Sequence, residues 1–294
     1  MISIIMPTYG RPEYISRAIN SILAQTYTDW ELIVIDDNPH DSLNRIETEK
    51  VVKRYTDSRI KYIQNAENMG GAKARNVGIF ASNGEYITFL DDDDMYLPEK
   101  LNVQYKEMLA NDWDVCVMDG ATYSFEDDSL LTVRHQRIKP GMTVEDLMRV
   151  HLIYHITGTN SFMFKSNFIK QIGGFEDIPS CQEYILMQKA LDAKPNFGYI
   201  PQILIRNYMH SGEQISTGIK KLKGQYIMYE NKKKYFHLLS IAQRNNVRCR
   251  HHGVLFFVHY RMRNYQQAIW EAIRCFLCSP KSAINWYKEY RHKI

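Results

Sequence analysis

Two periodicities alternate along the first 120 residues. Short apolar runs, typical of buried strands, are separated by stretches in which apolar residues recur at helical spacing. The predicted strands are Ile2–Met6, Leu32–Ile35, Ile60–Gln64, Glu85–Leu90 and Val115–Met118, and the predicted helices are a segment opening at Pro12, Leu43–Tyr55, Gly71–Ala81 and a segment from Pro98. Strands separated by helices of this length predict an α/β fold, with a mostly parallel sheet covered by helices on both faces.

Polar clusters follow three of these strands. They are PTYGR (Pro7–Arg11), Asp36–Asn38 and the four carboxylates Asp91–Asp94. In an open parallel sheet, ligands bind beyond the carboxyl ends of the strands, where the strand order reverses. The pattern therefore predicts a ligand site at this edge.

The remainder of the chain divides at about Gly218. From Met142 to Gly174 the pattern loosens, apart from a predicted strand at Phe162–Lys165. Residues 218–294 are predicted to be helical and hold 16 Lys or Arg against three Glu, a net charge of +13, whereas the rest carries −9. We expect a domain at 1–217, with a nucleotide-binding half (1–120) and an acceptor-binding half (121–217), followed by a basic, aromatic helical region at 218–294.

Composition narrows the class of protein. A chain of 294 residues with 45% hydrophobic residues is long enough to bury a substantial core. The sequence shows neither a signal-peptide pattern nor an apolar run of the ~20 residues that span a bilayer. Its five cysteines form no paired framework, and Cys275 and Cys278 have no second pair to complete a metal site. We expect a cytoplasmic protein with reduced thiols.

The Asp91–Asp94 run has two interpretations. Adjacent carboxylates repel one another, and a divalent cation removes that repulsion. Mg²⁺ and Mn²⁺ prefer oxygen ligands, and Mg²⁺ sites combine one or two carboxylates with phosphate oxygens. The alternative, of equal weight when the run is taken alone, is a turn in which Asp94 or a neighbour caps the helix near Pro98.

A glycine-bearing loop, Asn68–Asn76, leads into the helix that begins at Gly71. A helix N-terminus near Lys73 and Arg75 suits a pyrophosphate, although a plain helix start explains the same residues. The loop matches neither GxGxxG nor GxxxxGK[ST], which disfavours a Rossmann dinucleotide site and a P-loop.

Three ordered motifs resemble the family 2 glycosyltransferases of the GT-A fold. They are SIIMPTYGRPEYISRAINSILAQTYTDWELIVIDDN, ENMGGAKARNVGIFASNGEYITFLDDDD and GGFEDIPSCQEYILMQKAL. The resemblance covers Ile2 to Ser216. It implies a GT-A fold and transfer of a sugar from a nucleotide donor.

The resemblance also implies roles for residues at the strand ends. Pro7, Tyr9 and Arg11 correspond to the loop that holds the nucleotide, with Tyr9 near the base. Asp37 corresponds to the carboxylate that reads the uracil edge, whereas Asn68 and Arg75 correspond to positions near the nucleotide and its phosphates.

The DxD motif of the family corresponds to Asp91, Asp92 and Asp93. The resemblance implies that Asp93 binds Mn²⁺ or Mg²⁺ and that Asp91 and Asp92 lie near the ribose and the donor sugar. His210 corresponds to a position close to the metal or the diphosphate, and a structural loop histidine is the alternative.

An inverting transfer needs a base that deprotonates the acceptor hydroxyl. The family places an acid in a stretch that corresponds to Gln182–Met187, which makes Glu183 the expected base. The chain departs from the family pattern in having Glu for Asp and Ile185 for a second acid. His151 and His155 lack the Glu of an HExxH motif and are expected to be structural or to face the acceptor.

The basic region after Gly218 has three interpretations. Lys and Arg interleaved with Tyr, Phe and Trp are typical of a helical surface that lies on an anionic membrane. A helical packing or dimerisation element explains the same pattern. Nucleic-acid binding is a third interpretation, but no RNA- or DNA-binding module is visible and no nucleic-acid partner is expected.

The combined prediction is an inverting, metal-dependent glycosyltransferase. It would move a sugar from a UDP-sugar to a hydroxyl of a lipid-linked saccharide in surface polysaccharide biosynthesis, at the inner face of the cytoplasmic membrane. One rival is a sugar nucleotidyltransferase, which needs a glycine-rich basic loop where PTYGR stands. The other is a relative that binds sugar nucleotides with weak or no activity.

Overall fold

The computed structural model describes residues 1–210 and 218–284. Contacts divide the described residues into two units. The first, here called the sheet unit, comprises 1–138, 156–177 and 186–210. The second, the helical unit, comprises 139–155, 178–185 and 218–284. Two short segments of the range expected as the 1–217 domain therefore group with the C-terminal helices.

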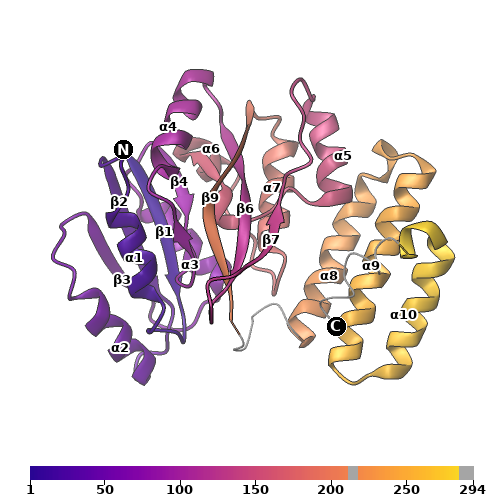
Figure 1. Ribbon diagram of the computed structural model, residues 1–294, viewed down its shortest axis with the longest axis horizontal. Helices are drawn as coiled ribbons and strands as arrows, with labels where there is room; N and C mark the ends of the chain where they lie inside the picture. The colour runs from indigo at the N-terminus through magenta and orange to yellow at the C-terminus, as the bar shows by residue number, and fades with distance from the viewer. Residues whose placement is uncertain (211–217, 285–294) are drawn as a thin grey trace. The chain divides into compact units, whose positions relative to one another are not determined.

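The first half of the sheet unit is a parallel sheet in the order β3-β2-β1-β4 (Figure 1). Its strands are β1 (Ile2–Thr8), β2 (Trp30–Asp36), β3 (Ile60–Gln64) and β4 (Tyr86–Phe89), and its helices are α1 (Ile15–Leu23), α2 (Leu43–Val52) and α3 (Gly71–Ala81). The segment opened by Pro12 becomes helical only at Ile15.

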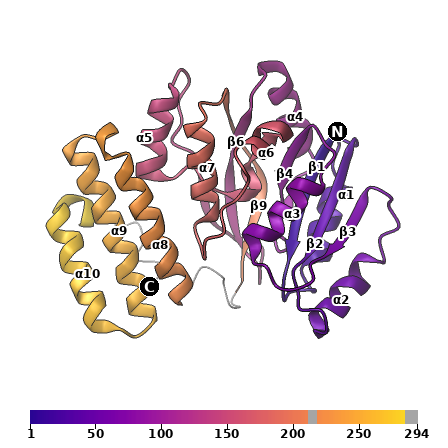
Figure 2. The ribbon, with the colours of Figure 1, turned by 180° about the vertical axis from the view of Figure 1, so that it is seen from behind.

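Alternate residues of β1 face opposite layers of helices. Ile4 belongs to a buried cluster that includes Ile15 and Ile19 of α1. On the other face, a Cβ on Gly78 of α3 would come within 2.5 Å of Ile5, so this helix packs closely against the strand. The two views show α1 and α3 on opposite sides of the sheet (Figures 1 and 2).

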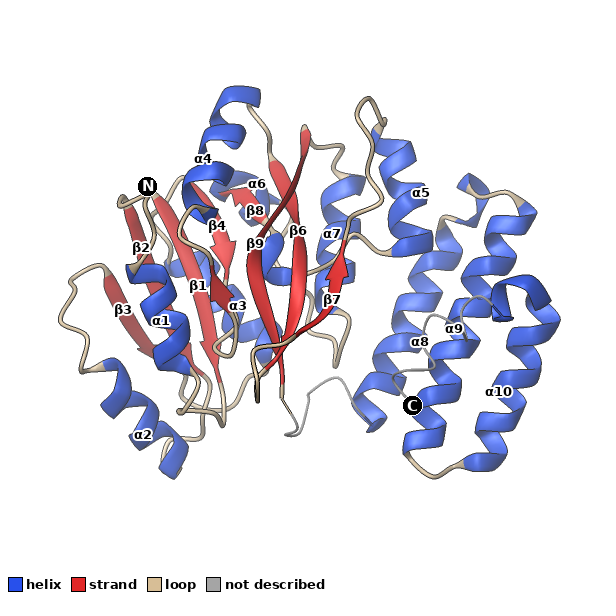
Figure 3. Ribbon diagram, in the orientation of Figure 1, coloured by secondary structure: helices blue, strands red, loops and turns tan. Residues whose placement is uncertain are grey.

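The second half extends the sheet with strands of mixed direction (Figure 3). Beyond β4 the order continues β8-β6-β9-β5, and β7 pairs with β6. The elements are β5 (Met95–Tyr96), α4 (Lys100–Asn111), β6 (Val115–Ser124), β7 (Leu130–Arg134), η1 (Thr159–Ser161), β8 (Met163–Lys165), α6 (Ser166–Gln171) and β9 (Phe197–Met209). Because β8 is antiparallel to both β4 and β6, those two strands run in the same direction.

The helical unit contains α5 (Val144–Tyr154), the first residues of α7 (Gln182–Asp192), α8 (Gly218–Lys234), η2 (Phe236–Leu238), α9 (Ile241–Arg261) and α10 (Tyr265–Cys278). Helix α9 lies between α8 and α10 (Figure 1). A capping box starts α5, in which Thr143 and Asp146 satisfy one another's backbone groups. The sequence pattern had not predicted this helix.

The expected fold class is confirmed. A mostly parallel sheet flanked by helices is followed by helices in the described part of the basic region. Within residues 1–210 and 218–284, no helix is long and apolar enough to cross a membrane.

Candidate active site

The carboxyl ends of β1, β2 and β4 meet at one edge of the sheet. Both β2 and β4 pair with β1 in parallel register, and Ile5 lies opposite Phe89. Residues after these strands therefore emerge side by side although they are far apart in the sequence. This edge is the one at which the strand-end polar clusters were predicted to meet.

Two arginines partner the carboxylates that follow β4. Arg11 Nη2 donates to Asp92 Oδ1 across 2.6 Å, and Arg11 Nη1 forms a short ion pair with Asp93. Arg75 Nη2, from α3, donates to Asp91 Oδ1 across 2.5 Å. The charge repulsion within the acidic run is thus offset by guanidinium groups that come from two other segments.

Burial has a strong effect on the protonation of this cluster. Burial raises the pKa of Asp92 to about 7, because the attraction of Arg11 only partly opposes desolvation and repulsion from Asp93. Burial works against the charge of Arg11 as well, but Asp92, Asp93 and Asp91 together hold its pKa above the ordinary value. At this edge of the sheet, the negative charges of the aspartates and the positive charge of Arg11 therefore largely offset one another.

Asp94 has a structural role. Its Oδ1 accepts from the Tyr208 backbone amide across 2.7 Å, and its Oδ2 accepts a short bond from Asn160. Burial and repulsion from Asp93 raise its pKa well above the ordinary value. The N-cap of α4 is Glu99, which makes no side-chain capping bond. The interpretation that Asp94 caps this helix was therefore wrong, since Asp94 connects the acidic loop to β9.

His210 joins the same cluster from the end of β9. Its Nε2 lies 3.1 Å from Asp93 Oδ2 and 3.2 Å from Arg11 Nη1. The ring stacks on Tyr14 with centroids 5.2 Å apart. The structure thus brings a carboxylate, an imidazole and a guanidinium to one point at the strand ends.

Asp37 organises a second group beside the first. Its Oδ1 accepts from the Met69 amide at 2.9 Å and from Asn65 Nδ2 at 2.7 Å, and its Oδ2 accepts from the Gly70 amide at 2.8 Å. Asn68 Nδ2 donates to the Asp37 carbonyl. Gly70 has φ +83°, a conformation that favours glycine, and is the N-cap of α3. Asp37 therefore fixes the loop that starts α3.

Pro7 and Tyr9 flank these groups on the first strand and its loop. Pro7 lies within β1, opposite Ile35 of β2. Tyr9 follows the strand and has 48% of its surface exposed, so that its ring is available to a planar ligand. The expected roles of both residues, and of Asn68, remain predictions.

The sequence interpretation missed Arg17 of α1. Its Nη2 donates to the Asp93 carbonyl at 2.7 Å, and its guanidinium lies 3.6 Å from the centroid of the Tyr208 ring. The sequence did offer a signal for Arg17, because it is a basic residue between the apolar helix positions Ile15 and Ala18. Asn160 also reaches this edge and donates to Asp94; it belongs to the stretch Thr157–Ser161, from which the sequence interpretation expected the shape of the sugar pocket.

Glu183 belongs to the helical unit, in the first turn of α7, and is half-buried. The residue after it, Tyr184, is buried, and its ring stacks on His151 with centroids 4.1 Å apart. Ile185 packs in an apolar cluster with Tyr184 and Met228. The position at which the family places a second acid is therefore part of the core of this unit.

The two histidines of α5 make structural contacts. His151 Nε2 lies 3.1 Å from the Tyr184 carbonyl, and His155 Nε2 lies 2.6 Å from Lys232 Nζ. His155 is also the C-cap of α5, with φ +63°. These contacts agree with the structural alternative for the pair.

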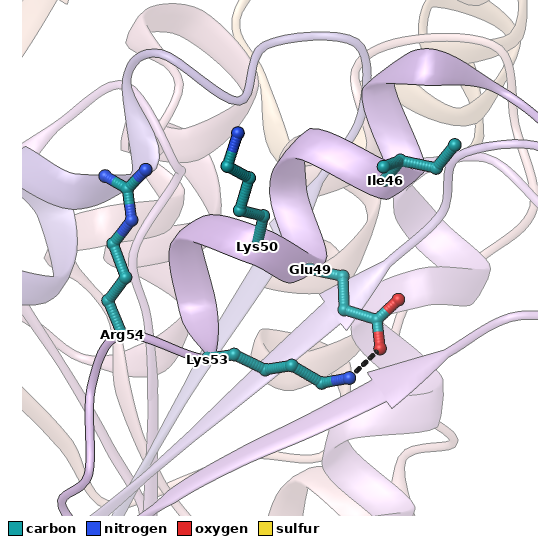
Figure 4. Close-up of a pocket in the computed structure, with 5 residues that line it drawn as sticks. All are labelled: Ile46, Glu49, Lys50, Lys53 and Arg54. Atoms are coloured by element: carbon teal, nitrogen blue, oxygen red, sulfur yellow. Dashed lines mark ion pairs between the residues drawn. The ribbon is translucent and has the colours of Figure 1, made fainter.

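A hollow of about 420 Å³ lies on the surface of α2 and the residues that follow it (Figure 4). Ile46, Glu49, Lys50, Lys53 and Arg54 line it, and Glu49 forms an ion pair with Lys53 at 2.5 Å. None of the predicted site residues contributes to it. The convergent side chains at the strand ends, and not this hollow, form the candidate site.

Comparison with known proteins assigns the family. The sequence profile described as "Glycosyl transferase family 2" matches residues 3–171, which is more than half of the chain. The chain belongs to glycosyl transferase family 2. The resemblance stated from the motifs is thereby confirmed, and glycosyltransferase activity is supported.

Two curated glycosyltransferases of Escherichia coli illustrate the likeness. WcaA of strain K12, whose name assigns it provisionally to colanic acid biosynthesis as a glycosyl transferase, is 30% identical over 246 residues, covering 80% of this chain and 82% of WcaA. WfgD is named a UDP-Glc:alpha-D-GlcNAc-diphosphoundecaprenol beta-1,3-glucosyltransferase. It is 42% identical over 111 residues, covering 38% of this chain and 42% of WfgD.

Among solved structures, a TarS fragment from S. aureus in complex with UDP-GlcNAc has the same fold. The TM-score is 0.63 with 18% identity, and the match covers 98% of this chain and 92% of the fragment. At that identity the likeness shows the fold alone. It confirms the GT-A architecture expected for a family 2 enzyme.

The donor atoms at the strand ends fit a divalent cation as a two-ligand site. Asp93 offers a carboxylate and His210 an imidazole, both of which suit Mn²⁺. No group of three or more His, Cys, Asp or Glu side chains in the described residues is arranged to hold a metal. A nucleoside diphosphate and water would have to supply the other ligands, as is usual for Mg²⁺. Arg11 now bonds Asp93 and would have to withdraw.

Proposed function

We propose that this family 2 glycosyltransferase transfers a sugar, with inversion, from a UDP-sugar to a hydroxyl of a lipid-linked saccharide during surface polysaccharide biosynthesis. The single observation that carries the proposal is the convergence of Arg11, His210 and Asp91–Asp93 at the ends of β1, β4 and β9. Convergent cationic and anionic groups at such an edge are suited to a diphosphate with its cation.

The donor nucleotide would lie along the ends of β1 and β2. Exposed Tyr9 offers a face on which a base can stack, and Asp37 with the Asn68–Gly70 loop forms the neighbouring edge. We assign to Asp37 the recognition of uracil, with one acceptor position on Oδ2 remaining beyond the Gly70 amide. We assign to Arg75 of α3, which pairs with Asp91, the contact with the phosphates.

Asp93 and His210 would hold Mn²⁺ or Mg²⁺, with Asp91 and Asp92 beside the ribose and donor sugar. The bound cation would neutralise negative charge that develops on the departing diphosphate. Arg11 pairs with Asp92 and Asp93 at this position. When released from Asp93, its guanidinium can bind a phosphate oxygen instead.

Glu183 is the proposed general base. Its carboxylate would take the proton of the acceptor hydroxyl as that oxygen bonds to the anomeric carbon, while the bond from that carbon to the diphosphate breaks and UDP leaves. Direct displacement inverts the anomeric centre and uses no covalent enzyme intermediate. Glu183 lies in the helical unit, in the first turn of α7.

The lipid-linked acceptor is proposed from a relative and from charge. WfgD, which is similar over 111 residues, is named for a diphosphoundecaprenol-linked acceptor and a UDP-glucose donor. The described part of the C-terminal region is rich in Lys and Arg, which suits an acceptor held at an anionic membrane surface. The proposed location of the enzyme is the cytoplasmic face of that membrane.

The test is UDP release from a panel of UDP-sugars, with a polyprenyl-diphosphate-linked monosaccharide as acceptor. We expect acceptor-dependent release for one donor, and a fall of at least about a hundredfold in kcat for Glu183→Gln with donor affinity unchanged. Glu176→Gln, an exposed acid outside α7, is the matched control and should retain full activity.

Two results would contradict parts of the proposal. Wild-type turnover by Glu183→Gln would eliminate that residue as the base. UDP binding without turnover of any donor by the wild-type chain would favour the non-catalytic relative that the sequence left open.

A further inference from the structure

The outward side of α10 carries an apolar surface. Within the helical unit the helix packs against α9 through Ala268, Glu271 and Cys275, which are buried. Six of its fourteen residues are large hydrophobic side chains that remain exposed: Tyr265, Ile269, Trp270, Ile273, Phe276 and Leu277. These six residues are called the α10 outer face below.

Helical spacing places these six side chains together. Tyr265, Ile269, Ile273 and Phe276 recur at intervals of four, four and three, and Trp270 and Leu277 are seven apart. At 3.6 residues per turn they span about 140° of the helix circumference, on the side away from the buried residues. In both views α10 lies beyond α9 with no described element of its own unit on its outer side (Figures 1 and 2).

The charges around the α10 outer face have one sign. Arg261 and Arg263 lie before the helix, Arg274 on it and Lys281 after it, and all four are exposed. Glu271 is the single acid between Arg261 and Ile284, and only 2% of it is exposed. It is bonded to His252 and Arg274. The exposed surface here is thus apolar and aromatic with a basic rim.

We propose that the α10 outer face docks onto an anionic lipid bilayer, with the helix in the plane of the interface. An amphipathic helix with Trp, Phe and Leu on one face and basic residues around it binds membranes in this way. Fourteen residues extend about 21 Å, which is shorter than the ~30 Å hydrocarbon core. The helix therefore lies on the bilayer and does not cross it.

A second copy of the chain is the competing occupant. Two copies meeting through this face would bring together two basic rims, and between Arg261 and Ile284 no exposed acid would pair with them. Like charges facing one another oppose association, whereas anionic headgroups are attracted. The charge distribution therefore favours the bilayer.

This inference rests on the proposed function in one respect: docking would bring the candidate active site to a lipid-linked acceptor. Binding to vesicles needs neither donor nor acceptor. Failure of docking and failure of the glycosyltransferase proposal are therefore separate results. A variant that no longer binds vesicles but still binds UDP has lost docking alone.

The experiment is flotation of the full chain with vesicles of equimolar phosphatidylcholine and phosphatidylglycerol, and with vesicles of phosphatidylcholine alone. We expect the chain to float with the anionic vesicles, and a smaller fraction of it to do so at high salt. The double variant Ile269→Gln/Ile273→Gln should lower the partition coefficient by at least about tenfold. The control is Ile219→Gln/Ile241→Gln, two exposed isoleucines of α8 and α9, which should bind as the wild type does.

Two single charge variants provide a second test that leaves the apolar side chains of α10 unchanged. Arg263→Gln and Lys281→Gln alter only exposed rim residues, and each should lower the partition coefficient for anionic vesicles by about fivefold. Circular dichroism and the Tm must match the wild type in every variant. Because these side chains are exposed, folding should be retained.

The proposal is overturned if the wild-type chain does not bind anionic vesicles, or if the outer-face variant and its control bind equally. It is also overturned if sedimentation shows a dimer that the outer-face variant dissociates while vesicles capture neither form. That last result would assign the α10 outer face to a second copy of the chain.

Discussion

Arg11 Nη2 lies 2.6 Å from Asp92 Oδ1, although 81 residues separate the two in the sequence. The arginine follows β1 and the fully buried aspartate follows β4, so the parallel pairing of those strands creates the contact. A guanidinium thereby stands among three carboxylates, in the position where the proposed function needs a metal ion and a diphosphate.

Replacing Arg11 should leave the carboxylates of the strand-end cluster with uncompensated negative charge. Arg11→Gln leaves Asp92 and Asp93 without their cation, and we expect a loss of about 2 kcal/mol in the free energy of unfolding, or roughly 5 °C in Tm. Excess Mn²⁺ should restore more of the Tm in this variant than it adds to the wild type, because the ion replaces the missing charge.

Arg59→Gln is the matched control for Arg11. Arg59 pairs with Asp57 at 2.6 Å on a more exposed surface. This variant should lose less stability, and Mn²⁺ should not rescue it. Equal effects of Mn²⁺ on both variants would mean that the strand-end carboxylates have no affinity for the ion.

Asp37→Asn separates two roles of Asp37. The amide has one acceptor oxygen where the carboxylate has two, so the Met69 and Gly70 amides cannot both keep their present bonds. We expect faster hydrogen exchange at these amides and about tenfold weaker UDP binding. If Asp37 also reads the base, preference for UDP over GDP should fall. Unchanged preference with weaker binding would leave Asp37 as a loop anchor alone.

Lys232 should make the stability of the helical unit depend on pH. Burial, with Arg250 nearby, lowers its pKa from 10.5 to about 7, while Cys181 opposes the shift. Its ammonium contacts His155 Nε2 and lies 5.2 Å from the centroid of the Tyr184 ring. Between pH 7 and 10.5 the unfolded chain binds a proton at Lys232 that the folded chain lacks, so stability should rise with pH in this window.

Urea unfolding of Lys232→Met checks this pH dependence. Relative to wild type, the variant should gain stability at pH 7 and lose most of that gain by pH 10, a swing of about 3 kcal/mol. Lys233→Met, on the exposed neighbour, should keep the wild-type pH dependence. A Lys232→Met variant that follows the wild-type curve would show that the lysine does not titrate in this window.

Cys249 of α9 and Cys275 of α10 should form a disulfide under oxidation. Their Sγ atoms lie 3.1 Å apart, and the bond with Cys275 lowers the pKa of Cys249. With diamide, the two thiols would lose two protons and two electrons while the diazene is reduced to a hydrazine. Mass spectrometry should then show loss of two hydrogens and a crosslinked peptide pair. The crosslink should stabilise the helical unit by about 3 kcal/mol.

The crosslink also tests how α10 packs against α9. Cys275→Ser must abolish the bridge, whereas Cys278→Ser should leave it intact. A bridge that joins Cys278 to Cys249 instead would place a different face of α10 against α9, and the α10 outer face would then have to be redefined.

Much of the sheet unit was predictable from local patterns. The strand Ile60–Gln64 and the helix Gly71–Ala81 have the predicted bounds, and turn-forming residues, Gly70 before and Ser82–Gly84 after, stand at the ends of the helix. The polar clusters were placed correctly since parallel strands end at a common edge. What local patterns did not supply was the partner of each charge, such as Arg11 for Asp92 or Arg17 for the Asp93 carbonyl.

The second half was less predictable because long-range pairing decides it. Strand β9 runs through Pro201 and pairs with both β6 and β5, with shifts of register along β6. Asp94 looks like a capping residue in the sequence, yet it bonds Tyr208, which is 114 residues away. Helix α5 did have a local signal, the Thr143–Asp146 capping box, which the weak apolar period after it obscured.

The central claim is that Asp93 and its neighbours bind a nucleoside diphosphate through a divalent cation. Titration calorimetry of the full chain with UDP, with and without Mn²⁺, tests it most directly, with GDP and Asp93→Ala as comparisons. We predict binding that requires Mn²⁺, favours UDP over GDP and disappears in Asp93→Ala. Binding that is indifferent to the ion and to Asp93, or no binding, would contradict the account and leave the four carboxylates with a structural role alone.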